Sequence, residues 1–85
     1  MENNKQVGAL ARHYTKDPCG NIIWGDFDVD FGGGRTLGKL EIGREFEILY
    51  GGIWVKTSLG YSETKDAYYL DKIGFINALG MTVRI

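Results

Sequence analysis

Residues 44–58 read Arg-Glu-Phe-Glu-Ile-Leu-Tyr-Gly-Gly-Ile-Trp-Val-Lys-Thr-Ser, and this stretch decides the fold. Two strand-like runs flank Gly51-Gly52, and adjacent glycines supply the positive φ angles that a two-residue hairpin turn needs. The turn fixes a register in which Ile48 faces Val55 and Glu47 faces Lys56. The face predicted to lie on the core carries Phe46, Ile48, Tyr50, Ile53, Val55 and Thr57. The other face carries Glu45, Glu47, Lys56 and Ser58, with Leu49 and Trp54 among them.

The rest of the chain alternates in the same way between short strand-like runs and turns. Thirteen of the 85 residues are glycine, about twice the average usage, and they separate runs of β-branched and aromatic residues. This punctuation is typical of an all-β domain. The strands expected outside the hairpin cover residues 8–14, 22–31, 67–71 and 81–85. Residues 15–21 are predicted to form a turn, 60–66 a loop, and 75–80 one helical or 3₁₀ turn closed by Gly80.

The strand predicted over residues 22–31 has the clearest period of two. One face carries Ile23, Phe27, Val29 and Phe31, and the other carries Trp24, Asp26, Asp28 and Asp30. The triplet Gly32-Gly33-Gly34 then ends the strand in a sharp turn. The three carboxylates predict a solvated acidic face, with a contact site for a basic partner as the alternative.

These elements predict a small SH3-like barrel. It has five or six short antiparallel strands and one 3₁₀ or helical turn before the last strand. Closure into a barrel removes the exposed edges that an open sheet of this size would leave. Residues 7–85 are expected to form this single domain after a flexible tail of residues 1–6, because 85 residues leave no length for a second domain.

The stretch from Leu40 to Ile85 resembles DUF5348, a domain of unknown function in small proteins of Gram-positive bacteria and their mobile elements. The opening hairpin of the family fits residues 8–10 and 27–34 more loosely. The resemblance implies a compact β domain and brings no activity with it. The matching motifs are Gly43-Arg44-Glu45-Phe46-Glu47-Ile48, Gly52-Ile53-Trp54-Val55-Lys56-Thr57, Tyr68-Tyr69-Leu70 and Gly80-Met81-Thr82-Val83-Arg84-Ile85.

Charge and composition argue against several classes of partner. Ten basic side chains face eleven acidic ones, so the formal net charge is −1. That balance disfavours non-specific binding to nucleic acid and to anionic membranes. Cys19 is the only cysteine, so no intramolecular disulfide forms. A secretory signal and a membrane span are both missing from the sequence, and we therefore expect a cytoplasmic protein.

No constellation of residues predicts an enzyme, a cofactor or a metal site. His13 and Cys19 are interpreted as a strand-end histidine and a turn cysteine, because nothing in the sequence orients the histidine as a base. Counted from Asp26, loop positions six and twelve of a calcium-binding loop are Phe31 and Leu37. The glycine and glutamate that such a loop requires are therefore missing.

Aromatic residues on polar faces are the strongest functional signal, because exposed Trp and Tyr mark recognition surfaces. Trp54 has two interpretations: a binding anchor, or a core residue covered by the N-terminal strand or a loop. SH3-like domains hold peptides on such an aromatic stripe. The predicted partner-binding residues are Trp54, Leu49, Trp24, Tyr61, Tyr69, Asp26, Asp28 and Asp30.

We therefore expect a small non-enzymatic protein-binding module, a monomer or weak homodimer. It would serve as an accessory protein of a mobile element or phage, with inhibition of a host defence protein as one form of that role. The alternative is a nucleic-acid-binding SH3-like domain. That alternative requires one basic face formed by Lys39, Arg44, Lys56, Lys65, Lys72 and Arg84.

Overall fold

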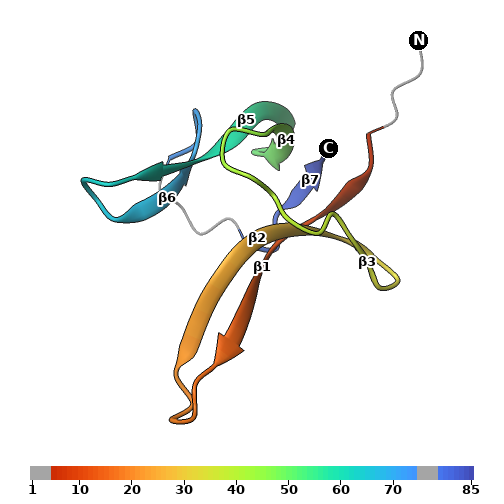
Figure 1. Cartoon of the computed structure of the whole chain (residues 1–85). Coiled ribbons are helices and arrows are strands. Elements are labelled where there is room, and N and C mark those ends of the chain that lie inside the picture. The colour runs from red at the N-terminus through yellow and green to blue at the C-terminus, as the bar shows by residue number, and fades with distance from the viewer. Residues whose placement is uncertain (1–4, 75–78) are drawn as a thin grey trace.

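Seven strands pair edge to edge in one open antiparallel sheet (Figure 1). The computed structural model describes residues 5–74 and 79–85, which contain no helix. The order across the sheet is β3-β2-β1-β7-β4-β5-β6, which leaves β3 and β6 at its edges. The all-β prediction is confirmed, and most of the predicted turn at 75–80 lies outside the described residues. The strands are β1 (Val7–Lys16), β2 (Ile22–Gly32), β3 (Arg35–Thr36), β4 (Glu45–Tyr50), β5 (Ile53–Ser62), β6 (Ala67–Leu70) and β7 (Thr82–Arg84).

The hairpin of β4 and β5 has the predicted turn and register. Gly51 and Gly52 have φ angles of 63° and 85°, and the pairing runs from Tyr50 opposite Ile53 to Glu45 opposite Ser58. The predicted core face is confirmed in the part of the hairpin away from the turn, where Phe46 and Ile48 are buried. It is wrong at the turn, because Tyr50 is 44% and Ile53 64% exposed. The end of the hairpin extends beyond the core, so these two side chains reach solvent.

The core lies around β7, between the β1–β2 pair and the β4–β5 pair. Strand β7 pairs with both β1 and β4 and carries the fully buried Val83 at the centre. Strand β5 changes partner along its length: residues 53–58 pair with β4 and residues 59–62 with β6. The buried apolar residues are Leu10, Val29, Leu40, Phe46, Ile48, Leu59, Leu70 and Val83.

Two elements differ from the predicted ones. Strand β3 is additional, because the turn at residues 32–34, with three positive φ angles, returns the chain onto β2, where Thr36 pairs with Asp30. Strand β5 continues through the start of the predicted 60–66 loop, because Tyr61 and Ser62 pair with β6. Of the predicted tail, Gln6 exchanges two backbone hydrogen bonds of 2.9 Å with Ile85.

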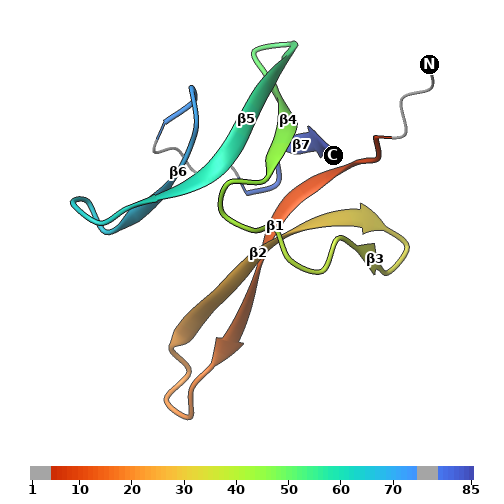
Figure 2. The ribbon, with the colours of Figure 1, turned by 45° about the horizontal axis from the view of Figure 1, so that its top comes forward.

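Two hairpins project from this core in different directions (Figures 1 and 2). The far ends of β1 and β2 form one arm, joined by the predicted turn, in which Asp17 accepts hydrogen bonds from the backbone of Cys19 and Asn21. Strands β5 and β6 form the other arm. The arms make the molecule elongated: its radius of gyration is 13.7 Å, against about 12 Å for a compact chain of this length.

Replacing Gly51 with valine should destabilise the fold by roughly 1–2 kcal/mol or more, because a β-branched residue disfavours positive φ. An added Cβ meets no atom within 4 Å, so the cost lies in the backbone alone. Urea unfolding measures it. Gly51→Asn is the matched control, since asparagine tolerates this conformation. Equal losses in both variants would contradict the turn assignment.

Candidate functional site

A β-bulge in the β1–β2 arm determines where Trp24 lies. Arg12 pairs with Phe27, whereas Tyr14 pairs with Trp24. One β1 residue, His13, therefore lies opposite two β2 residues, Gly25 and Asp26. The extra residue reverses the alternation of β2, so Trp24 shares a face with Phe27. The predicted placement of Trp24 beside the three aspartates is wrong for this reason.

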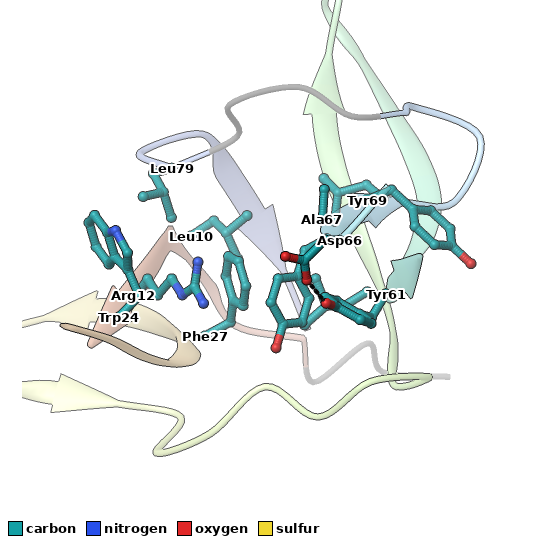
Figure 3. Close-up of a pocket in the computed structure, with 12 residues that line it drawn as sticks. Leu10, Arg12, Trp24, Phe27, Tyr61, Asp66, Ala67, Tyr69 and Leu79 are labelled. Atoms are coloured by element: carbon teal, nitrogen blue, oxygen red, sulfur yellow. Dashed lines mark hydrogen bonds between the residues drawn. The ribbon is translucent and has the colours of Figure 1, made fainter. Parts of the chain in front are cut away.

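The face of the arm that carries Trp24 and Phe27 forms one wall of a groove of about 570 Å³, and β5 and β6 form the other wall (Figure 3). The buried core residues Leu10, Leu59 and Leu70 also line it. The rings of Phe27 and Tyr68 connect the two walls, with centroids 5.0 Å apart in an edge-to-face arrangement. The groove is thus an outward continuation of the core.

Arg12 lies at the centre of this groove. Its guanidinium carbon is 4.5 Å from the ring centre of Phe27, 5.0 Å from that of Tyr68 and 5.4 Å from that of Trp24. Its Nε atom donates a 2.9 Å hydrogen bond to the carbonyl oxygen of Gly25, within the bulge. The same bulge that turns Trp24 toward the groove therefore also holds Arg12 in place.

The β5–β6 arm contributes the remaining polar groups of the groove. The Tyr61 hydroxyl donates a hydrogen bond to Asp66, and this bond raises the pKa of the tyrosine. The ring of Tyr61 packs edge-to-face on Tyr68 at 4.9 Å. Tyr69 also borders the groove, but its ring lies over Gly60 on the other face of the hairpin and points away from Arg12 (Figure 3).

The three predicted site aspartates do not form one acidic face. Asp26 and Asp30 are exposed, whereas Asp28 is only 2% exposed. Asp28 accepts hydrogen bonds from the backbone of Val29 and Gly38 and binds His13 Nε2 at 2.7 Å. Burial raises the pKa of Asp28, but these hydrogen bonds outweigh burial and hold the pKa below its ordinary value. The predicted solvated role is wrong for Asp28, which fastens the loop after β3 to β2.

Replacing Asp28 with alanine should destabilise the fold by roughly 1–3 kcal/mol, because two backbone N–H groups and His13 lose their acceptor. Chemical denaturation of the variant measures the loss. Asp26→Ala is the matched control on the same strand, and its exposed side chain should change stability by no more than about 0.5 kcal/mol. Similar effects of both changes would contradict the structural role of Asp28.

Trp54 and Leu49, the other predicted anchors, pair with each other across the β4–β5 hairpin. Trp54 is half-buried, and the guanidinium carbon of Arg84 lies 4.2 Å from its ring centre. Glu47 binds Arg84 Nε at 2.7 Å and Lys5 Nζ at 2.6 Å. Trp54 therefore belongs neither to the groove nor to the cluster of buried core residues, and an ion-paired arginine of the same chain covers it.

Glu47 should give the fold an acid-sensitive component. The hydrogen bonds from Arg84 and Lys5 lower the pKa of Glu47 from 4.5 to about 2. Because folding lowers this pKa, the stabilisation is fully present above pH 4.5 and is lost as the pH falls to about 2. The difference in Tm between the wild type and Glu47→Gln should therefore shrink over that interval, as thermal melts at several pH values would measure. A constant difference would contradict the ion-pair network.

His13 and Cys19 lie in different parts of the β1–β2 arm. His13 binds Asp28, and Cys19 is exposed in the turn of the arm. No cluster of three or more His, Cys, Asp or Glu side chains suited to a metal occurs in residues 5–74 and 79–85. Within the same residues, no helix has the length and apolar character to cross a membrane.

The sequence prediction missed Arg12 and Tyr68 as groove residues. The signal for Arg12 is its spacing: Leu10, Arg12 and Tyr14 alternate along β1 and share one face. The signal for Tyr68 is its pairing with the predicted residue Tyr61. Each signal places its residue on one face of its own hairpin. The groove itself is not indicated, because it joins two hairpins that are far apart in the sequence.

Comparison with known proteins identifies the family of the chain. The family model described as "Domain of unknown function (DUF5348)" matches residues 19–85, which include β2 to β7 and therefore most of the residues that line the groove. No curated protein and no solved structure matches the chain significantly. The match covers more than half of the sequence, and the chain therefore belongs to the DUF5348 family.

Proposed function

We propose that this protein is a small non-enzymatic module that binds a protein partner in the groove between its two arms. The observation that carries this proposal is the exposed aromatic wall: Trp24 is 49% exposed although it lies beside the core. Exposed tryptophan and tyrosine next to a fixed arginine are the residue types that dominate binding energy at protein interfaces.

The shape of the site fits an extended peptide segment of the partner. Tyr14 and Ile22 continue the face of Trp24 toward the end of the arm, and both are exposed. At the other end, Tyr61 and Tyr68 line the groove on the second arm. An apolar track that continues from the groove along the arm supports an extended ligand, like the peptides that bind along the aromatic grooves of SH3 domains.

The distribution of charge favours a protein partner over nucleic acid, the second candidate. Lys56 and Arg84 are ion-paired with Glu45 and Glu47. Lys39 lines a different hollow together with Asp26 and Glu41. Stacking of nucleobases on the rings would need a cationic track for the phosphates. These three basic side chains are instead divided between different parts of the surface.

We also propose an SH3-like organisation and an accessory role in a mobile element or phage, including inhibition of a host defence protein. The segment after β3 supports the first, because backbone N–H groups of Leu40 and Gly43 donate to Phe27 of β2 and Leu59 of β5. That segment thus bridges the two sides of the open sheet. The second rests on the resemblance of the chain to small proteins of such elements.

A random peptide library selected on the immobilised protein tests the binding site. Selected peptides should bind Trp24→Ala about 30-fold more weakly, since a central aromatic anchor contributes about 2 kcal/mol or more. Fluorescence polarisation measures the affinity. Because Trp24 is exposed, the variant should keep the Tm of the wild type in a thermal melt.

Trp54→Ala is the matched control, because it removes the other tryptophan, which lies outside the groove. Peptides that lose affinity for Trp54→Ala but not for Trp24→Ala would contradict the groove as the site. Sub-micromolar, salt-sensitive binding of a random single-stranded DNA pool, lost in Trp24→Ala, would favour the nucleic-acid alternative.

A further inference from the structure

Two arginines of this protein lie against tryptophan rings, and only one of them forms an ion pair with a carboxylate. Arg84 packs on Trp54 and binds Glu47 through Nε at 2.7 Å. Arg12 packs against Trp24 and two further rings, but its Nε is bound to the carbonyl of Gly25. Within residues 5–74 and 79–85, no carboxylate lies within ion-pairing distance of Arg12.

The terminal nitrogens of Arg12 are accessible donors. Among the described residues no buried side-chain nitrogen or oxygen lacks a hydrogen-bond partner, so the Nη atoms, which form no hydrogen bond within the described chain, are open to the groove. A guanidinium has five N–H donors in a planar fork that matches a carboxylate. The rings and the Gly25 carbonyl already fix its plane, which lowers the entropic cost of binding an anion.

We propose that the groove binds a peptide segment with an internal acidic side chain flanked by apolar residues, and that Arg12 pairs with that carboxylate. This inference rests on the proposed function and specifies the ligand. Arg12 is the only basic side chain among the described lining residues, and Asp66 lies on the opposite wall. Asp66 accepts the hydrogen bond of Tyr61 and is not paired with Arg12. A single unpaired cation suits a single carboxylate, whereas a phosphate backbone would need several cations.

The position of Arg12 within the groove selects an internal side chain over a chain terminus. Apolar surface extends from Arg12 in both directions, toward Tyr14 and Ile22 on one arm and toward Tyr61 on the other. Lys16 lies opposite Ile22, at the outer end of the first surface. A peptide that ended at Arg12 would leave one of these surfaces uncovered. Apolar residues on both sides of the acidic one cover both.

The test uses peptides selected from a random library on the whole protein, then synthesised with blocked termini. We expect an acidic residue beside apolar ones, and a Glu→Gln or Asp→Asn change in the peptide should weaken binding about 10- to 100-fold. Arg12→Met, which keeps an apolar stem over the rings, should cause a similar loss. Combining both changes should add little further loss.

Arg84→Met is the matched control and should leave peptide affinity unchanged, because it removes the other tryptophan-stacked arginine. The peptide change leaves the protein intact, so the test holds even where an arginine variant unfolds. Trp24-dependent peptides without an acidic residue would overturn this inference and leave the proposed function standing. Binding that needs only a free C-terminal carboxylate would also overturn it. Failure to select any Trp24-dependent peptide would overturn the proposed function itself.

Discussion

The site depends on the bulge at Gly25 and Asp26. A regular strand would place Trp24 on the face of β2 opposite Phe27, where it could not line the groove. The additional residue brings both rings to one face, and the Gly25 carbonyl it presents accepts the hydrogen bond of Arg12. One local irregularity therefore orients the aromatic wall and holds the central cation. Bulges commonly redirect side chains in this way next to functional sites.

The groove obtains its rigidity from the core beneath it. Leu10, Leu59 and Leu70 are buried residues that also line the groove, and they come from both arms. The Phe27–Tyr68 ring contact joins the walls above them. A ligand would therefore meet a surface whose geometry is set by folding, which lowers the entropic cost of binding.

Local signals made the central hairpin predictable, and long-range contacts made the groove unpredictable. Gly51-Gly52 fixes its register within 15 residues, so the pairs from Glu45–Ser58 to Tyr50–Ile53 follow from sequence alone. The face of Trp24 depends on which β1 residue lies opposite it. The burial of Asp28 depends on Gly38, ten residues away, whose N–H it accepts. Neither partner is indicated by alternation along β2 itself, which is why the period of two placed Trp24 on the wrong face and predicted solvent around Asp28.

The two tryptophans show how folding and binding divide the aromatic surface. Trp54 lies under Arg84, and the Glu47 carboxylate neutralises that arginine within the chain. This arrangement is complete, and it shields apolar surface that would otherwise be exposed. Trp24 has the same kind of arginine neighbour without such a carboxylate and remains half-exposed on a projecting arm. A ring that is 49% exposed gains less stability from burial than a core residue does. The combination fits the proposed binding of an external ligand, which would cover the ring and supply a carboxylate for Arg12.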